Sequence, residues 1–509
     1  MRTGRASVAA LGVAALALAG PVASVLAAPG TEVGIEDERL LLTEPAQAPE
    51  VVADWADAGV DVVRIHARWV AVSPGSDRAR RPAGFDVGDQ RDPGYDWGTL
   101  DAAVDLVRAA GMRPTLTVTG PGPLWSSRNP SLREVRYKPD PQLFARFAHA
   151  VATRYGDRVD RYMIWNEPNQ PGWLQPQSTC PRRRACFPVA PHLYRGLVRA
   201  ARPVIEAADP GAQVLLGELA PIGRRAISPR TPIAPLPFLR TMACVDARYR
   251  PLRGGACAGF KPASADAFGY HPHGVHNGPE RRNPNRDQAQ IADLSRLFTA
   301  LDRLTRRGRI GAPRGRFDVY LTEFGYQTSP PDHLVGVTLA QQSRYLQQGA
   351  YVAWRHPRVR NVTQYQWRDE PVTFRGRGKP SYAGWQSGLR FVNDRPKPSM
   401  ATFRAPFVVD LPRGRRRARL WGQVRPGDGR RDVTVLRLRR GGRSFEPIAD
   451  LQTDVDGYWS REMIVERTAK YQFAWFDQAA EPNAQPERHL SGVVDLASGG
   501  SRRWHASRP

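Results

Sequence analysis

The middle of the chain alternates short apolar runs with longer amphipathic segments, beginning at Val33. The short runs are rich in Val, Leu, Ile, Thr and aromatic residues and predict buried strands at 33–36, 62–66, 114–118, 161–165, 213–218, 266–273, 317–325 and 362–367. Apolar residues at helical spacing predict helices at 49–58, 100–110, 141–155, 193–208, 288–306 and 339–354. Eight strands alternating with helices are typical of a (β/α)₈ TIM barrel, which places its functional groups at the carboxyl ends of the strands.

Beyond Ala405 the pattern changes to short alternating runs separated by Gly and Asp turns. These runs predict strands at 433–438, 445–448 and 471–476, with a hairpin-like turn at 453–459. Because no helical period is present, we interpret this part as a small β-sandwich of the immunoglobulin-like or fibronectin-like kind. We expect it to be a spacer rather than a binding module.

The first 27 residues have the composition of a secretory signal peptide. Arg2 and Arg5 precede a run of Ala, Leu and Val that ends at an A-x-A-like site at 25–27. This run is short for the alternative of an uncleaved membrane anchor, and no other stretch is long and apolar enough to span a bilayer. We therefore predict a secreted, extracellular protein with a signal peptide at 1–27, a barrel at 28–408, a β-sandwich at 409–497 and a disordered tail at 498–509.

Four cysteines fit an exported protein. Cys180 and Cys186 flank a short basic segment, and Cys244 and Cys257 flank a Gly-rich turn. We favour local pairing within each of these two segments, although four cysteines allow three connectivities. A zinc site is the weaker alternative, because neither pair has the usual ligand spacing.

The net charge of +25 comes almost wholly from arginine. The arginines are scattered, without the interleaved aromatic residues or the motif that a nucleic-acid-binding protein usually shows, so we do not expect nucleic acid as a partner. Attraction to anionic cell-wall polymers or to an acidic polysaccharide is the minor alternative that this charge supports.

The predicted strand at 161–165 stops abruptly at a carboxylate. Its apolar and aromatic residues fit a buried strand, and Pro168 ends it because proline has no N–H to donate to the sheet. Asn166 and Glu167 therefore belong to the carboxyl end of the strand. A glutamate in such a place is commonly a solvated loop charge, but one that follows a buried barrel strand is a candidate functional group.

A second strand of the same design is predicted at 317–325. A period of two places four residues on one face, apolar until the last: Phe317, Val319, Leu321 and Glu323. A barrel that returns its strands side by side brings Glu167 and Glu323 to the same edge. Two carboxyl groups placed in this way suit hydrolysis of a glycosidic bond, because one attacks the sugar while the other holds a proton for the leaving oxygen.

Together, Trp-Asn-Glu-Pro-Asn at 165–169 and Leu-Thr-Glu-Phe-Gly at 321–325 resemble the paired motifs of the retaining glycoside hydrolases of clan A, with wording closest to families five and thirty-nine. The resemblance covers residues 33 to 408, or nearly so. It implies a TIM barrel with Glu167 as acid/base on the fourth strand and Glu323 as nucleophile on the seventh. It also implies an oligo- or polysaccharide substrate and no cofactor.

The resemblance implies roles for polar residues at other strand ends. Asn166 resembles the asparagine that binds the sugar 2-OH, and Arg64 the arginine that keeps the nucleophile ionised and oriented. Tyr270, His271 and His273 end the sixth strand, where the clan often places a His or Tyr near the nucleophile. Strand capping for Asn166 and a surface salt bridge for Arg64 are the simpler alternatives. His271 and His273 alone are weak evidence for a metal, because no third ligand follows at matching spacing, and we expect hydrogen bonding instead.

Aromatic residues near the strand ends are candidates for stacking on sugar rings. Trp367, at the tip of the eighth strand, resembles the clan's platform for the sugar at the cleavage point, with core packing as the alternative. Four others are predicted in strand-end loops: Trp125, Trp173, Tyr326 and Trp385. Three polar residues also end strands and are weaker candidates for contact with substrate: Glu36, His66 and Glu218.

We therefore predict a secreted enzyme that hydrolyses β-linked O-glycosides by double displacement. An inverting glycosidase is the enzymatic alternative, and it needs carboxyl groups about 6.5–9.5 Å apart rather than about 5–5.5 Å. The alternative from another class is a non-catalytic carbohydrate-binding or wall-associated barrel. In that case the cleft would be blocked, or the two glutamates would point away from each other.

Overall fold

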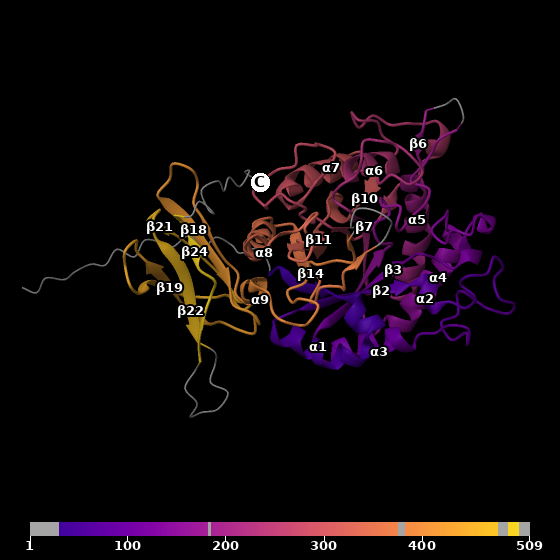
Figure 1. Ribbon diagram of the computed structural model, residues 1–509. Helices are drawn as coiled ribbons and strands as arrows, with labels where there is room; N and C mark the ends of the chain where they lie inside the picture. The colour runs from indigo at the N-terminus through magenta and orange to yellow at the C-terminus, as the bar shows by residue number, and fades with distance from the viewer. Residues whose placement is uncertain (1–29, 182–184, 375–381, 477–486, 498–509) are drawn as a thin grey trace, which may run out of the picture.

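The computed structural model describes residues 30–181, 185–374, 382–476 and 487–497. The predicted signal peptide at 1–27 and the predicted tail at 498–509 lie outside these ranges. In Figure 1 the chain forms a larger α/β part, coloured indigo to orange, and a smaller β part, coloured orange to yellow.

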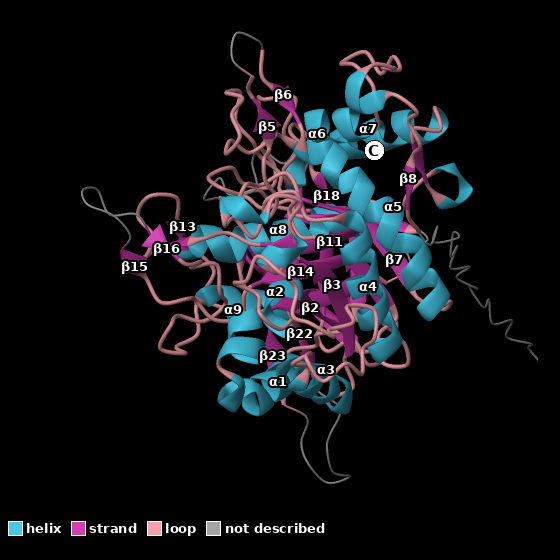
Figure 2. Ribbon diagram, turned by 90° about the vertical axis from the view of Figure 1, so that its right-hand side faces the viewer, coloured by secondary structure: helices cyan, strands magenta, loops and turns pink. Residues whose placement is uncertain are grey.

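The larger part is a closed barrel of eight parallel strands in the order β1-β14-β11-β9-β7-β4-β3-β2. The strands are β1 (Glu32–Glu36), β2 (Val62–Arg68), β3 (Arg113–Thr119), β4 (Arg161–Ile164), β7 (Gln213–Leu219), β9 (Ala267–Tyr270), β11 (Val319–Phe324) and β14 (Val359–Tyr365). Helices surround these strands (Figure 2). The predicted TIM barrel is confirmed, and each of the eight strands overlaps the segment predicted for it.

The helices follow the predicted pattern, with small shifts at their ends. They are α1 (Ala48–Asp57), α2 (Trp69–Val72), α3 (Gly98–Ala109), α4 (Pro141–Tyr155), α5 (Ala190–Ala208), α6 (Pro235–Met242), α7 (Leu294–Arg306), α8 (Leu339–Trp354) and α9 (Pro398–Arg404). The pattern did not predict α2, α6 or α9, which are too short to show a clear helical period. The sixth strand ends at Tyr270 rather than His273, so both histidines lie in the loop beyond it.

Short strand pairs decorate the loops of the barrel. They are β5 (Ser178–Thr179) with β6 (Phe187–Pro188), β8 (Ala263–Ser264) with β10 (Ile310–Gly311), β12 (Thr328–Ser329) with β13 (Val337–Thr338), and β15 (Thr373–Phe374) with β16 (Tyr382–Ala383). Disulfides join Cys180 to Cys186 and Cys244 to Cys257, which confirms the local pairing. Across the described ranges, we find no helix with the length and apolar character that a membrane span needs.

Side chains of the barrel strands alternate between the barrel interior and the surrounding helices. Met163, Leu215, Ala267 and Tyr320 form a small cluster of their own, whereas their strand neighbours belong to the main core. Phe317, Val319 and Leu321 belong to the main core, as does Phe324, so a strict alternation would turn Glu323 toward the helices too. The pairing register of β11 with β14 shifts between Leu321 and Phe324, and Glu323 instead reaches Arg64. The predicted shared face is therefore wrong at its last residue, because a β-bulge re-aims that side chain.

The smaller part consists of two antiparallel sheets. One contains β17 (Phe407–Asp410), β18 (Arg417–Gln423) and β21 (Tyr458–Ile464); the other contains β19 (Asp432–Leu438), β20 (Glu446–Gln452), β22 (Lys470–Phe476), β23 (Arg488–Leu490) and β24 (Val494–Asp495). Phe407, Trp459 and Phe473 share one core between the sheets, as in a β-sandwich. The boundary predicted between 408 and 409 falls inside β17.

The β-sandwich packs against the outer face of α8. Tyr351 and Trp354 of this helix form a buried cluster with Val408, Trp421 and Tyr458. The Tyr458 hydroxyl donates to the carbonyl of Thr31 at 2.8 Å, immediately before β1. This contact lies at the amino end of β1, opposite to the strand ends that carry the site.

Candidate active site

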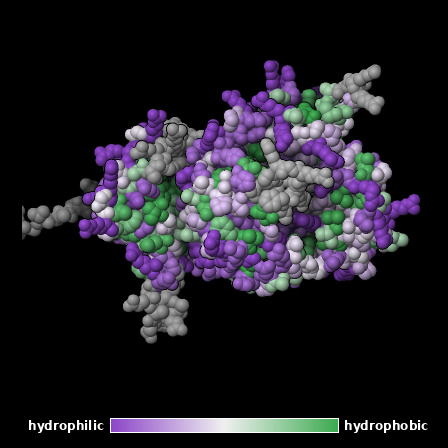
Figure 3. All heavy atoms as spheres, in the orientation of Figure 1, coloured by the Kyte–Doolittle hydropathy of each residue, from purple (hydrophilic) through white to green (hydrophobic). Residues whose placement is uncertain are grey.

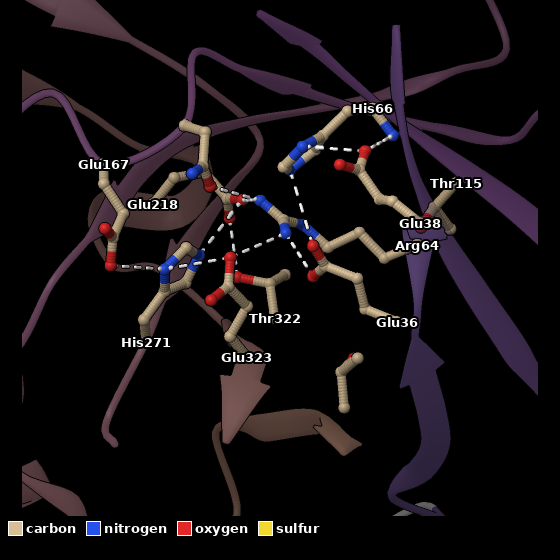
Figure 4. Close-up of polar contacts among 12 residues, drawn as sticks. Glu36, Glu38, Arg64, His66, Thr115, Glu167, Glu218, His271, Thr322 and Glu323 are labelled. Atoms are coloured by element: carbon tan, nitrogen blue, oxygen red, sulfur yellow. Dashed lines mark hydrogen bonds and ion pairs between the residues drawn. The ribbon is translucent and has the colours of Figure 1, made fainter. Parts of the chain in front are cut away.

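Polar side chains from six barrel strands converge at the carboxyl end of the barrel (Figure 4). Glu36, Arg64, Glu218 and Glu323 end β1, β2, β7 and β11 or lie near their ends, Asn166 and Glu167 follow β4, and His271 follows β9. The structure thus brings together six residues of the predicted site: Arg64, Asn166, Glu167, His271, His273 and Glu323.

Arg64 is the buried centre of this cluster. Its guanidinium donates to Glu323 Oε1 at 2.8 Å, to Asn166 Oδ1 at 2.7 Å and to Glu218 Oε2 at 2.5 Å. It also donates to Glu36. Burial opposes the charge, but the surrounding carboxylates raise the pKa of Arg64 well above its ordinary value. The fork of donors on one rigid group therefore fixes several strand ends at once, and the alternative of a surface salt bridge is excluded.

Glu323 is held as a carboxylate. Besides Arg64, His271 Nδ1 lies 3.3 Å from its Oε1 and His273 Nε2 lies 3.1 Å from its Oε2. Burial alone would raise the pKa of Glu323, but the charge of His271, the hydrogen bond from His273 and the charge of Arg64 hold it well below its usual range. An ionised, oriented carboxylate is the form a nucleophile needs.

Glu167 occupies a constrained backbone at the end of β4. Trp165 and Glu167 have φ values of 64° and 36°, in the left-handed region that costs a non-glycine residue about 1 kcal/mol or more. Packing holds this turn, because the Trp165 ring contacts Phe144 and the Asn166 amide donates to Thr119 Oγ1 at 2.9 Å. The turn presents Glu167 beside His271, with a side chain 18% exposed.

The two predicted catalytic glutamates share one neighbour. His271 Nδ1 lies 3.2 Å from Glu167 Oε1 and 3.3 Å from Glu323 Oε1, so these two oxygens are no further apart than the two distances together, 6.5 Å. The carboxyl groups thus point toward the same imidazole and not away from each other. The geometry required for a pair acting on one glycosidic bond is present.

His271 is a buried cation rather than a metal ligand. Burial opposes its charge, but Glu323, Glu167 and Glu218 together raise the pKa of His271 to about 10. An imidazolium has no free nitrogen lone pair, although ligand atoms of His271, His273 and Glu323 do lie within 4.8 Å of one another. The donor set fits hydrogen bonding to carboxylates better than a metal.

A cavity of about 520 Å³ opens in front of the two glutamates. Asn166, Glu167 and Glu323 line it, and Trp173 and Trp385 contribute aromatic surface. Trp385 is 42% exposed and stacks on His273 with ring centroids 5.9 Å apart. The size suits a saccharide unit, and the mixture of rings and polar groups is typical of small-molecule sites.

Four residues predicted to bind substrate do not line this cavity: Tyr270, Trp125, Tyr326 and Trp367. All four are buried. Tyr270 and Tyr326 donate their hydroxyls to backbone carbonyls, Trp125 donates its indole N–H to Pro74, and the Trp367 ring contacts Trp55 edge-on. Their surroundings give each side chain a packing role, and Trp385 takes the exposed position that we predicted for Trp367.

Residues of β1 and β2 add an acidic side to the cavity that the sequence analysis underrated. Glu36 and His66 line it, and so does Glu38, which was not predicted. His66 Nδ1 lies 2.8 Å from Glu38 Oε1, and Arg68 forms an ion pair with the same carboxylate. The only signal in the sequence was their place at or after a strand end. Glu218, by contrast, is fully buried and outside the cavity lining.

The sequence matches no known protein family and no curated protein. Among solved structures, it is similar to a family 39 glycoside hydrolase from Bacteroides cellulosilyticus WH2, at 13% identity over 86% of this chain and 81% of that one, with a TM-score of 0.48. It is also similar to a glucosidase from Croceicoccus marinus, at 11% identity over 85% and 93% of the chains, with a TM-score of 0.47. A third likeness is to a GH5_18 variant from Streptomyces cattleya in complex with Manβ1-4GlcNAc, at 18% identity over 73% and 78%, with a TM-score of 0.47.

Proposed function

We propose that this protein is a retaining O-glycosyl hydrolase that cleaves β-linked glycosides or polysaccharides by double displacement. The observation that carries the proposal is the placement of Glu167 and Glu323, whose facing oxygens are at most 6.5 Å apart beside an open cavity. Retaining enzymes place the two carboxyl groups about 5–5.5 Å apart, whereas inverting enzymes leave about 6.5–9.5 Å for a water. The upper bound favours the retaining mechanism.

In the first step, the Glu323 carboxylate attacks the anomeric carbon of the sugar. The bond from that carbon to the glycosidic oxygen breaks, its electron pair stays on the leaving oxygen, and Glu167 gives that oxygen a proton. Asn166 is placed by Arg64 to accept or donate a hydrogen bond at the sugar 2-OH. The result is a glycosyl ester on Glu323 and a free alcohol.

In the second step, Glu167 is a carboxylate and acts as base. It takes a proton from water while the water oxygen attacks the anomeric carbon, and the ester bond to Glu323 breaks. Glu323 leaves as a carboxylate that Arg64 and the two histidines stabilise in place. The sugar keeps its anomeric configuration after the two inversions.

Aryl β-glycosides can test the two roles separately. We expect Glu323→Gln to abolish turnover of every substrate that the wild type cleaves. We expect Glu167→Ala to lower kcat/KM by about 10²–10⁴-fold on substrates with poor leaving groups, and by much less on dinitrophenyl glycosides, which need no acid. Azide should restore turnover in Glu167→Ala and give a β-glycosyl azide.

Other outcomes of the same assay contradict the proposal. Full activity of Glu323→Gln would exclude it as the nucleophile, and release of the α-anomer by the wild type would establish an inverting enzyme. If neither aryl glycosides nor a panel of plant and bacterial polysaccharides is cleaved, while polymer binding is equal in wild type and variant, the protein is the carbohydrate-binding barrel of the alternative hypothesis.

We further propose that the protein acts outside the cell. Two disulfides support this proposal, because such bonds form and persist mainly in oxidising compartments. The signal peptide predicted at 1–27 gives the route of export.

We also propose that one end of the β-sandwich binds anionic cell-wall polymers. The connections β17–β18, β19–β20 and β21–β22 lie at this end, where Val465 donates to Arg416 and Arg439 lies near Glu466. Seven exposed arginines gather there: Arg413, Arg415, Arg416, Arg417, Arg439, Arg440 and Arg443. Apart from Arg439, none of them has an ion-pair partner within the described residues. Hydrophilic residues cover much of the visible face of the molecule (Figure 3).

A further inference from the structure

We propose that Glu218 is a positioning residue of the active site, whose carboxylate keeps His271 as a cation donating to both catalytic glutamates. The proposal rests on the function proposed above and deepens it. Glu218 is fully buried and does not line the cavity, so it cannot touch the substrate. Its effect must pass through the groups it contacts.

A β-bulge turns Glu218 into the barrel. Val214 and Leu216 of β7 belong to the core on the helix side, so alternation would turn Glu218 toward the helices. The pairing of β7 with β9 instead shifts between Gly217 and Leu219, and Glu218 has φ of 49°. A bulge next to an active site commonly serves to re-aim one side chain. Glu323 on the neighbouring β11 is re-aimed in the same way.

Two glycines clear the space that this carboxylate occupies. A Cβ added at Gly269 of β9 would lie 1.8 Å from Glu218 Oε1, and one added at Gly217 would lie 2.4 Å from the Gly269 carbonyl oxygen. Gly217 also has φ of 119°, a conformation that only glycine adopts readily. The bulge and both glycines therefore make a slot for one buried carboxylate.

Every polar contact of Glu218 is with a residue of the site or its strands. Thr322 donates its hydroxyl to Oε1 at 2.7 Å, and Arg64 donates to Oε2 at 2.5 Å. His271 Nε2 lies 3.4 Å from the same Oε2. Glu218 thus accepts from the far side of the imidazole, while the near nitrogen faces Glu167 and Glu323. An imidazole that donates on both sides must carry two protons.

The charges facing His271 balance only with Glu218 ionised. Glu167 after β4, Glu218 on β7 and Glu323 on β11 face the ring, with Arg64 behind them. Burial and neighbouring acids raise the pKa of Glu36 well above its usual range against the opposing effect of Arg64, so that carboxyl is neutral. The Arg64 charge, the hydrogen bond from His271 and its charge lower the pKa of Glu218, although burial opposes them. Two buried cations are then matched by Glu218 and Glu323.

The sign of the pH dependence follows from His271. Its pKa of about 10 lies above the ordinary value of 6.5, so the stabilising charge is complete below pH 6.5 and is lost as the pH rises through 10. Without the Glu218 charge, the pKa of His271 falls. Glu323 then loses part of its cationic surroundings, and its own pKa rises.

The test uses Glu218→Gln, with Glu218→Asp as the variant that keeps the charge. We expect NMR titration of the His271 ring to show its pKa lowered by at least about 2 units in Glu218→Gln and by less than about 1 unit in Glu218→Asp. For Glu218→Gln we also expect kcat to fall about 10–100-fold at pH 7 with KM nearly unchanged, and the acid limb of kcat/KM to move upward by about 1 unit.

An unchanged His271 titration in folded Glu218→Gln would overturn the proposal, and so would an equal loss of activity in both variants without any shift of the pH profile. If Glu218→Gln does not fold, Thr322→Val removes the hydrogen bond to Oε1 and should lower the pKa of His271 by a smaller amount; no change would again overturn it. The NMR readout does not require turnover. A wild type without glycosidase activity would therefore contradict the proposed function and leave the positioning role to be decided by the titration.

Discussion

Single side chains around the cavity divide into those that hold the chemistry and those that offer a surface for the sugar. Arg64 and the histidines belong to the first group, because they are buried and bonded to carboxylates. Trp385 belongs to the second: it is 42% exposed, and its backbone N–H donates to Glu370 at 3.1 Å. An exposed ring fixed in this way can stack on the apolar face of a sugar with little loss of side-chain entropy.

We expect Trp385→Ala to weaken substrate binding more than catalysis. Loss of the stacking surface should raise KM about tenfold, which corresponds to about 1.4 kcal/mol, with kcat changed by less than about threefold. Steady-state kinetics on a cleaved aryl glycoside measures both constants. Phe476→Ala removes a ring that is 51% exposed on the β-sandwich and should change neither constant. A large fall in kcat with constant KM would contradict the stacking role.

At the scale of elements, the site depends on how helix α4 delivers strand β4. Asp140 caps the helix by accepting from the amides of Gln142 at 2.8 Å and Leu143 at 3.1 Å, before Pro141 in the first turn. Further along α4, Phe144 contacts Trp165, the residue that begins the turn carrying Glu167. The cap therefore stabilises the support of the acid/base residue.

Asp140→Ala should lower the free energy of unfolding by about 0.5–2 kcal/mol, because two helix amides lose their acceptor. Its ion pair with Arg128, at 3.3 Å on the surface, adds little to this loss. Urea unfolding followed by tryptophan fluorescence measures the change. The matched control is Asp157→Ala, which removes a carboxylate with 83% side-chain exposure beyond the other end of α4 and should cost less than about 0.5 kcal/mol. Equal effects of the two substitutions would contradict the capping role.

At the scale of the whole molecule, charge is unevenly placed. The net charge is +25, yet the cavity is lined by Glu36, Glu38, Asp96, Glu167, Glu323 and Glu370 against Arg39 and Arg68. The exposed arginines at the end of the β-sandwich belong to connections that do not line this cavity. A polyanion bound to the arginine-rich end would thus leave the acidic cavity free for a neutral sugar.

Charge reversal at this end should weaken binding to polyanions. We expect the triple variant R415E, R416E and R440E to bind inorganic polyphosphate and polygalacturonate at least about tenfold more weakly at low salt, and the wild-type affinity to fall as salt is added. The control variant R78E, R80E and R81E makes the same charge change at exposed barrel residues. Similar losses in the two variants would show that only net charge matters and would contradict a specific surface.

Much of the barrel could be predicted from the sequence, because hydrophobic periodicity is a local property of each segment. The strands and the long helices differ from their predictions by a few residues at their ends. The paired motifs around Glu167 and Glu323 also predicted which strand ends carry the candidate chemistry. The short helices and the small strand pairs could not be predicted, because a few residues show no period and depend on contacts with the rest of the chain.

The sequence by itself determined the class of fold, the two glutamates and their place at strand ends, since each follows from residue type and local pattern. Only the tertiary structure decided which way the side chains point. Alternation alone turns Glu218 and Glu323 toward the helices, and bulges that depend on pairing with β9 and β14 turn them inward. It also decided that Trp367 is core and Trp385 is surface, because burial depends on neighbours such as Trp55 that lie far away in the chain.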